Sequence, residues 1–176
     1  MLSTLSDRLR FCLWLSLALL VVLADQWTKG LAESGLEYGR AVAVLPILNM
    51  SLQYNTGAAF SFLSDAGGWQ RWAFSAIALG ISIIICVWLS RLKREEWLMA
   101  WSLSFILGGA IGNLWDRVTL GHVVDFISVH YASWYFPAFN LADSAISVGA
   151  AMMILDTLFQ GRKEERLEGD KEGDKQ

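Results

Sequence analysis

The sequence predicts an all-α membrane protein with four transmembrane helices and a small β-sheet at the outer leaflet. The 176-residue chain is 55% hydrophobic, with a mean hydropathy of +0.41. Charged residues make up 18%, below the roughly 25% usual in soluble domains. Nine Trp and nine Phe favour contact with a membrane interface. Long uncharged stretches recur along the chain, as a multi-pass membrane protein requires.

Four stretches have the length and polarity of membrane helices. A helix needs about 20 mostly apolar residues to cross the hydrocarbon core. Two of the stretches contain 19 residues with no charge, the first contains Asp25 if it is extended to Thr28, and the last contains Asp143 near its start. The predicted spans are Phe11–Ala24 with its extension, Trp72–Ser90, Trp97–Trp115 and Phe139–Gln160.

The first stretch also has features of a cleavable signal peptide, because Arg8 and Arg10 form a basic segment in front of an apolar core. A cleavage site of small residues does not follow, since the chain continues as ADQWTKG from Ala24. We therefore expect this stretch to be retained as a span, with a cleaved signal peptide as the alternative.

The distribution of Lys and Arg predicts the orientation in the membrane. Ten of the fourteen lie before the first span, between the second and third, or after the fourth. This places both termini in the cytoplasm and turns segments 29–71 and 116–138 outward. The tryptophans then form two interfacial belts. The outer belt comprises Trp27, Trp69, Trp72, Trp115 and Trp134, and the inner belt comprises Trp14, Trp88, Trp97 and Trp101.

The outward segments contain patterns of extended structure. From 49 to 55 the sequence NMSLQYN alternates apolar and polar side chains, which predicts a half-buried strand. Val123, Ile127 and Val129 share the parity of Asp125, so a second short strand is the favoured interpretation there, with a helix as the alternative. These strands form the small sheet of the predicted fold.

A single domain accounts for residues 1–160, including the outer segment 29–71. Residues 161–176 are charged and contain one Leu and no aromatic residue. We expect this last segment to be a disordered cytoplasmic tail.

Unusual polar residues gather at one membrane face of this topology. An Asp at the centre of a membrane helix costs about 2.5–3.5 kcal/mol on insertion scales, so such residues are expected to face a functional cavity. For Asp25 or Asp116 taken alone, an interfacial charge at a helix end is the alternative. The residues at the outer face are Asp25, Asn55, Asn113, Asp116, Arg117, Asp125, Asn140 and Asp143.

Spacing places some of these side chains on common helix faces. Asn140 and Asp143 are three residues apart and share a face, although Asn140 also suits the role of a helix N-cap. Arg117 suits bidentate pairing with a carboxylate or a lipid phosphate, and a snorkelling anchor is the alternative. Gly108 and Gly112 form a G-x-x-x-G step, which allows two helices to approach closely.

The remaining residues exclude several chemistries. His122 and His130 do not stand in a metal-binding spacing. Cys12 and Cys86 lie in apolar runs, without a base partner or enough further ligands for a metal. The sequence contains no G-x-S-x-G elbow, P-loop or dinucleotide fingerprint. We therefore expect neither a metal nor a cofactor.

Two carboxylates held close together favour acid–base hydrolysis. They do not both ionise readily, so one keeps a proton. The ionised acid activates water for attack on a peptide carbonyl, while the protonated acid polarises that carbonyl. Asp125 and Asp143 are the predicted pair. A proton or ion pathway and a purely structural use of the polar groups are the alternatives, although no polar trail reaches the inner face.

Five sequence blocks resemble lipoprotein signal peptidase, also called signal peptidase II or prolipoprotein signal peptidase, and they follow the order of that family. The resemblance extends over nearly the whole chain, to about Gln160. The blocks are DQWTK (25–29), NTGAAFS (55–61), GGAIGNLWDR (108–117), VVDFI (123–127) and FNLADS (139–144).

The resemblance implies an aspartyl endopeptidase of the bacterial inner membrane, with four transmembrane helices and an outer-leaflet β-cradle. Its implied substrates are diacylglyceryl-modified prolipoproteins, cut just before the lipidated cysteine, and globomycin-type inhibitors occupy its site. Membrane lipids surround it, and no nucleic-acid partner is implied. The implied catalytic residues are Asp125 and Asp143. The implied substrate-binding or supporting residues are Asp25, Lys29, Asn55, Gly108, Asn113, Arg117 and Asn140.

Overall fold

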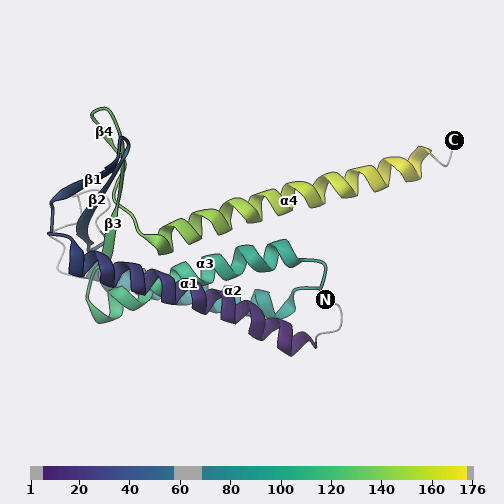
Figure 1. Cartoon of the computed structure of the whole chain (residues 1–176). Coiled ribbons are helices and arrows are strands. Elements are labelled where there is room, and N and C mark those ends of the chain that lie inside the picture. Colours follow the sequence, from purple (N-terminus) through teal and green to yellow (C-terminus); the bar gives the residue numbers. More distant parts are fainter. Residues whose placement is uncertain (1–5, 58–68, 174–176) are drawn as a thin grey trace.

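The computed structural model describes residues 6–57 and 69–173, with side chains described as far as residue 159. Within these residues the chain forms four helices and one four-stranded antiparallel sheet (Figure 1). The helices are α1 (Asp7–Gly35), α2 (Trp69–Arg91), α3 (Trp97–Thr119) and α4 (Leu141–Gly173). Each contains a segment long and apolar enough to cross a membrane, which in α4 is Leu141–Phe159. The prediction of four membrane helices with a small sheet is confirmed.

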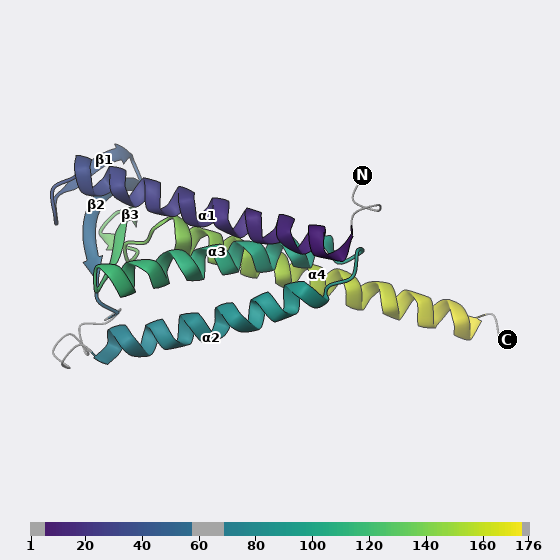
Figure 2. The same ribbon diagram turned by 90° about the horizontal axis from the view of Figure 1, so that it is seen from below.

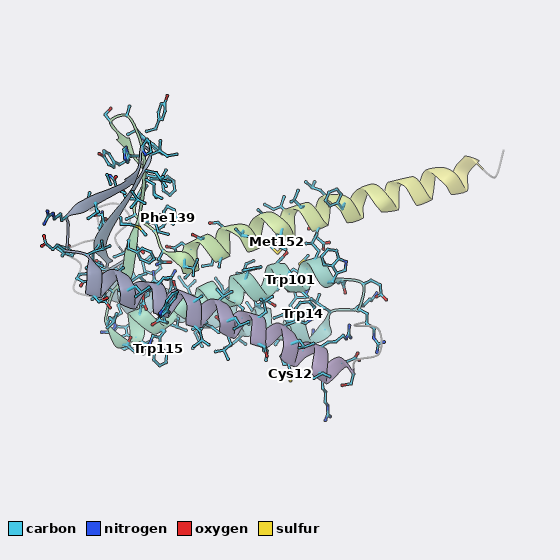
Figure 3. The ribbon with its side chains drawn as sticks, in the orientation of Figure 1. Cys12, Trp14, Trp101, Trp115, Phe139 and Met152 are labelled. Atoms are coloured by element: carbon cyan, nitrogen blue, oxygen red, sulfur yellow. The ribbon has the colours of Figure 1, made fainter. Side chains whose placement is uncertain are left out.

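The helices extend away from a sheet that lies at one end of the bundle (Figure 2). The start of α1 and the end of α4 both lie toward the opposite end. We call these the sheet end and the terminal end. Figure 3 shows Trp115, which the sequence predicts for the outer belt, near the sheet end, and Trp14 and Trp101, predicted for the inner belt, nearer the terminal end.

Helix α1 is longer than the predicted first span, because it continues beyond Thr28 to Gly35. Asp25 and Lys29 therefore lie inside the helix and not at its exit. Both are buried, with 0% and 2% of their surfaces exposed. A 2.7 Å ion pair between them compensates charge inside the helix. Helix α1 therefore ends at Gly35, within segment 29–71, which the sequence predicts to face outward.

Helix α4 begins at Leu141 and continues to Gly173. Its backbone is helical after Gln160, where the sequence predicts a disordered tail. The Glu, Lys and Arg residues of this stretch explain the difference, because they are strong helix formers. In the predicted outer segment, residues 58–68 lie outside the described residues, and so does most of the sequence block 55–61.

Helix α3 is packed against α1 on one side and α4 on the other through glycines. A Cβ at Gly108 would lie 2.6 Å from Cβ of Val21 and 2.7 Å from the carbonyl oxygen of Ala18, both in α1. A Cβ at Gly109 would collide with the carbonyl oxygen of Ala142 in α4. The prediction that the glycine step admits a close helical neighbour is therefore confirmed.

An apolar cluster holds α1, α2 and α3 together from the middle of the bundle toward the terminal end. Leu103 and Leu107 of α3 are each only 1% exposed. The buried members of the cluster are Ala18, Ile85, Leu89, Met99, Ala100, Leu103 and Leu107. The sheet end is outside this cluster and depends on other contacts.

The sheet consists of β1 (Ala41–Leu45), β2 (Leu48–Asn55), β3 (Val123–Tyr131) and β4 (Trp134–Tyr135), in that spatial order. The two predicted strands are the neighbours β2 and β3, which pair Gln53 with Asp125 and Asn55 with Val123. The sequence patterns do not predict β1 and β4, because all of their residues are exposed and show no alternation of burial.

The turn from α3 into β3 depends on Gly121. Its φ of 87° lies in the left-handed region, which glycine adopts without steric cost. The N–H of Gly121 donates to the carbonyl oxygen of Asp116 at 3.2 Å and so closes the end of α3. The turn brings the start of β3 back onto α3, which places Asp125 at the sheet end of the bundle.

Candidate active site

Asp125 of β3 is buried, with 2% of its surface exposed. Its Oδ2 accepts a hydrogen bond from Asn55 Nδ2 at 3.0 Å, and its Oδ1 accepts one from Asn140 Nδ2 at 2.8 Å. Burial raises the pKa of Asp125 to about 6; the two hydrogen bonds oppose the rise, and the nearby charge of Asp143 adds to it. Asp125 therefore keeps its proton closer to neutral pH than an exposed aspartic acid does.

Asp143 lies in the first turn of α4, where it forms a reciprocal cap with Asn140. The N–H of Asp143 donates to Asn140 Oδ1 at 2.9 Å, and the N–H of Asn140 donates to Asp143 Oδ2 at 3.3 Å. This exchange satisfies N–H groups that a helix start leaves without partners. Asn113 Nδ2 donates to the other carboxylate oxygen, Oδ1, at 2.7 Å. The carboxylate is thus held at the positive end of the helix dipole.

Asn140 joins the two aspartates. Its side chain is completely buried. While its Oδ1 caps α4, its Nδ2 lies 2.8 Å from Asp125 Oδ1, 3.1 Å from Asn113 Oδ1 and 3.2 Å from the Val124 carbonyl oxygen. The N-cap interpretation of Asn140 is confirmed, and the same side chain lies between Asp125 and Asp143. Two aspartates that are 18 positions apart in the sequence therefore both bond to Asn140.

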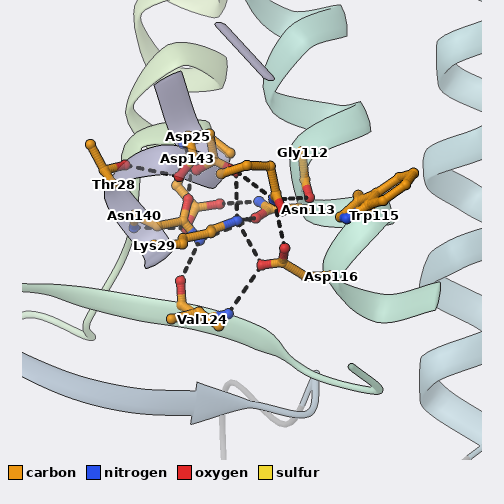
Figure 4. Close-up of polar contacts among 12 residues, drawn as sticks. Asp25, Thr28, Lys29, Gly112, Asn113, Trp115, Asp116, Val124, Asn140 and Asp143 are labelled. Atoms are coloured by element: carbon orange, nitrogen blue, oxygen red, sulfur yellow. Dashed lines mark hydrogen bonds and ion pairs between the residues drawn. The ribbon is translucent and has the colours of Figure 1, made fainter. Parts of the chain in front are cut away.

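Lys29 connects this pair to a second group of acids (Figure 4). Its Nζ lies 2.7 Å from Oδ2 of Asp25 and 2.7 Å from Oδ2 of Asp116. The third donor of the ammonium group meets Asn113 Oδ1 at 3.0 Å. Since Asn113 also donates to Asp143, a continuous network runs from Lys29 to Asp143. Every hydrogen of the buried ammonium has an acceptor, which a buried charge requires.

Arg117 lies at the edge of the network. Its Nη1 donates to the carbonyl oxygen of Asn113 in the same helix at 3.3 Å, and its guanidinium lies 5.5 Å from the ring centroid of Phe74. Its Nε has no partner in the described part of the chain, and no ion pair to Arg117 occurs there. The predicted pairing with a carboxylate is therefore not observed, although the guanidinium interacts electrostatically with Asp143 and Asp125.

A pocket of about 220 Å³ opens beside Asp125. The lining comes from β2, β3 and the segment before α4, and consists of Gln53, Tyr54, Asn55, Thr56, Asp125, Pro137 and Ala138. Asp125 and Asn55 are the network side chains that meet this pocket. Within residues 6–57 and 69–159, no group of three or more His, Cys, Asp and Glu side chains is arranged to hold a metal ion.

Most residues selected from the sequence meet in one hydrogen-bonded network. Gly108 does not, because it lies at the contact of α3 with α1, and Arg117 is peripheral. The residues in the network are Asp25, Lys29, Asn55, Asn113, Asp125, Asn140 and Asp143.

Two further network residues, Gln26 and Asp116, are not among the catalytic or supporting residues that the resemblance implies, although Asp116 is one of the polar residues predicted at the outer face. Gln26 Nε2 donates to Asp116 Oδ1 at 2.7 Å, and Asp116 is 1% exposed. A signal for Asp116 exists in the sequence, because an acid at the end of a membrane helix is costly unless it has a partner. Gln26 carries no comparable signal, since an uncharged amide near a helix end is unremarkable in a sequence.

Comparison with known proteins connects this network to one family. The family model described as signal peptidase (SPase) II matches residues 17–159. The lipoprotein signal peptidase of Ectopseudomonas mendocina is 54% identical over 153 residues, which cover 86% of this chain and 90% of that protein. The lipoprotein signal peptidase of Pseudomonas aeruginosa (strain UCBPP-PA14) is 52% identical over 159 residues, covering 89% and 94%.

The fold is also that of a solved bacterial membrane enzyme, determined by the in meso method at 1.9 Å resolution. The TM-score is 0.73 at 32% sequence identity, and the match covers 82% of this chain and 92% of the other. With four apolar helices of membrane length, the chain is a multi-pass membrane protein. From the family match and the identity over most of its length, this chain belongs to the lipoprotein signal peptidase (signal peptidase II) family.

Proposed function

We propose that Asp125 and Asp143 form the catalytic dyad of a membrane aspartyl endopeptidase. The enzyme removes the signal peptide from diacylglyceryl-modified prolipoproteins by cutting just before the lipidated cysteine. The observation that carries the proposal is the position of Asn140, which bonds to Asp125 through its amide and to Asp143 through the helix cap. Because both acids bond to Asn140, we assign to them the acid and base roles that hydrolysis requires.

We assign the role of each acid from its surroundings. Asp125, with a pKa of about 6, is the acid. Asp143, whose oxygens accept hydrogen bonds from N–H donors of Asn113 and Asn140, is the base. Asp143 takes a proton from water as the water oxygen attacks the carbonyl carbon preceding the cysteine, and Asp125 gives its proton to the carbonyl oxygen.

The resulting tetrahedral diol then collapses. The C–N bond breaks, Asp143 returns its proton to the cysteine nitrogen, and Asp125 recovers a proton from one hydroxyl group. The products are a signal peptide with a new carboxyl end and a lipoprotein with the lipidated cysteine at its N-terminus. The chemistry on this route needs neither a covalent intermediate nor a metal.

The pocket beside Asp125 supplies the space for the substrate backbone. The diacylglyceryl chains stay in the bilayer, because the acids lie at the end of membrane-length helices. Arg117, whose guanidinium lies at the edge of the network, is the supporting residue proposed to bind a substrate carbonyl. Globomycin-type inhibitors compete for this same space.

Charge distribution supports the orientation of the enzyme in the bacterial inner membrane. Ten of the fourteen Lys and Arg residues precede the first predicted span, lie between the second and third, or follow the fourth. Since cationic loops remain in the cytoplasm, the terminal end with both termini is cytoplasmic. The sheet end with the dyad then faces outward, where the modified cysteine of a translocated prolipoprotein emerges.

Cleavage of a purified, lipidated precursor in detergent tests the dyad. Asp125→Asn and Asp143→Asn should each lower kcat by about 10³-fold, because each removes a proton-transfer group while keeping its shape. Thermal melting should change little in both variants. Asp7→Asn is the matched control, since the Asp7 carboxylate is 81% exposed and pairs only with Arg10 among the described residues. Wild-type cleavage by either dyad variant would show that the assignment is wrong.

A further inference from the structure

The network contains a second pair of aspartates that the proposed chemistry does not use. Asp25 of α1 and Asp116 of α3 are 0% and 1% exposed. Asp25 Oδ1 accepts the main-chain N–H of Ala142 at 2.9 Å. Asp116 Oδ2 accepts the main-chain N–H of Val124 at 3.2 Å. Each of these acids therefore holds the backbone at the residue immediately before one proposed catalytic aspartate.

Two donors connect this second pair of acids to each other. Lys29 Nζ lies 2.7 Å from Oδ2 of Asp25 and 2.7 Å from Oδ2 of Asp116. Gln26 Nε2 lies 2.7 Å from Asp116 Oδ1 and 3.3 Å from Asp25 Oδ2. Because one cation and one amide bridge the same two carboxylates, the distance between Asp25 and Asp116 is restrained by two independent sets of bonds.

The surrounding helices leave these acids little freedom to move. A Cβ at Gly112 would lie 2.6 Å from Asp25 Oδ2, so α3 already contacts this carboxylate. Gln26 Nε2 also lies 3.3 Å from the carbonyl oxygen of Gly112, which ties its amide to α3. Buried polar groups with all partners present are rigid, because each broken bond would leave an unpaired group away from water.

We infer that Asp25, Asp116, Lys29 and Gln26 form an aspartate brace, a set of positioning residues that fixes the separation of Asp125 and Asp143 through the N–H groups of Val124 and Ala142. The inference rests on the proposed function, because it presupposes that Asp125 and Asp143 are the catalytic dyad. The brace gives Asp116 and Gln26 roles in the reaction, although neither lines the pocket beside Asp125.

The geometry also explains why the second pair is made of acids. A carboxylate accepts a main-chain N–H with one oxygen and still has sites for the bridging donors, whereas an amide presents only one acceptor oxygen. The brace contains two carboxylates and one ammonium group, so one negative charge is not balanced by a cation. Neutral N–H donors must stabilise that charge. Gln26, Val124 and Ala142 supply those donors.

The variant Gln26→Met tests the brace, because Met keeps the length of Gln and removes its amide. Loosening the brace should displace Val124 and Asp125 relative to Asn55 and Asn140. We expect kcat to fall about tenfold, since small misplacements of reacting groups are costly, while KM stays unchanged. The limb of the pH–rate profile that belongs to Asp125 should move to higher pH, because weaker hydrogen bonds no longer oppose its raised pKa.

Thr28→Val is the matched control in the same helix. The Thr28 hydroxyl donates only to carbonyl oxygens of α1, those of Ala24 and Asp25, among the described residues. We expect unchanged kcat, KM and pH profile for this variant. A double-mutant cycle with Asp116→Asn adds a second readout. If Gln26 acts through Asp116, then Gln26→Met should have little further effect in the Asp116→Asn background.

The outcomes separate the brace from the dyad. Loss of kcat with a shifted pH profile and a non-additive cycle supports the brace. A lower melting temperature with unchanged kcat and pH profile of the folded enzyme overturns it, and so does an additive cycle. If Asp125→Asn and Asp143→Asn are inactive while Gln26→Met matches the wild type, the brace fails and the dyad stands. If the two dyad variants cleave normally, the proposed function itself fails.

Discussion

The two ends of the helix bundle are held together by different kinds of contact. From the middle toward the terminal end, apolar side chains such as Leu103 and Leu107 fill the space between helices. Polar groups buried there include serines that bond within their own helix, as Ser102 Oγ does to the Leu98 carbonyl oxygen at 2.8 Å. At the sheet end, charged and amide side chains bond from one helix to another, as Lys29 does to Asn113 at 3.0 Å.

The apolar contacts hold the helices together, whereas the hydrogen bonds at the sheet end fix the positions of individual side chains. In a bilayer, helices associate mainly through close packing, because lipid tails are as apolar as Leu side chains. Apolar contacts are not directional, so they set the distance between helices without orienting single atoms. Hydrogen bonds between ionised groups and amides are short and directional. The sheet end therefore has directional contacts that can hold the proposed pair of acids in place.

The largest expected effect compares Lys29→Met with Leu103→Ala. Lys29→Met leaves two buried carboxylates without their cation, which should cost about 3–5 kcal/mol of stability. It should also lower kcat by about 10²-fold. Leu103→Ala should cost a similar amount, about 2–5 kcal/mol, yet leave the kcat of the folded enzyme unchanged. Thermal melting and precursor cleavage, measured where both variants are folded, check this. If both variants lose kcat equally, the idea that only the sheet end positions the reactive groups is wrong.

An intermediate effect is expected from two glycines that both lie between α3 and α4. A Cβ at Gly109 would meet the Ala142 carbonyl oxygen, next to Asp143, whereas one at Gly149 would lie 2.6 Å from the Ser102 carbonyl oxygen. Both alanine variants should lower the melting temperature, because backbone atoms must move. Only Gly109→Ala should also lower kcat, by about tenfold. The comparison fails if Gly149→Ala reduces kcat of the folded enzyme as strongly.

The smallest expected effect is a shift in pH dependence at the rim of the pocket. Asn55 Nδ2 donates to Asp125 at 3.0 Å, and its Oδ1 is held by the Gly57 N–H at 2.9 Å. The bond favours the ionised form of Asp125, whose pKa burial raises to about 6. Asn55→Ala removes the bond, so this pKa should rise further.

Because Asp125 is the proposed acid, activity is lost as the pH rises through its pKa. Asn55→Ala should therefore move the alkaline limb of the kcat/KM profile to higher pH and leave the acidic limb in place. A profile of kcat/KM against pH for both proteins is the measurement. If the acidic limb moves instead, Asp125 is the base and Asp143 the acid. If neither limb moves, Asp125 does not take part in the proton transfer.

Much of the fold follows from local patterns in the chain. Uncharged runs such as Trp72–Ser90 predict the four helices, and the alternation at 49–55 predicts β2. The sequence does not predict that α1 continues to Gly35 with Asp25 and Lys29 in its interior, because both look too polar there until their ion pair is seen. β1 and β4 have no predictive pattern, since a strand exposed along its whole length imposes no alternation.

The candidate site was predictable as a set of residues but not as an arrangement. Asp125 and Asp143 stand out because acids in apolar surroundings are costly. Nothing in the sequence places Asn140 between them, and Gln26 looks like an ordinary residue at the end of a helix. Their importance becomes visible only from bonds between α1, α3, β3 and α4.

The amino-acid sequence alone determined the number of membrane-length helices and the two central strands, because hydrophobic length and alternation act over neighbouring residues. Only the tertiary structure decided that Asp125 of β3 and Asp143 of α4 both bond to Asn140, and that a second pair of acids holds the backbone beside them. The physical reason is that hydrogen bonds between distant segments require atoms to align within a few tenths of an ångström. That alignment depends on how closely the helices pack at their glycines and on the turn at Gly121.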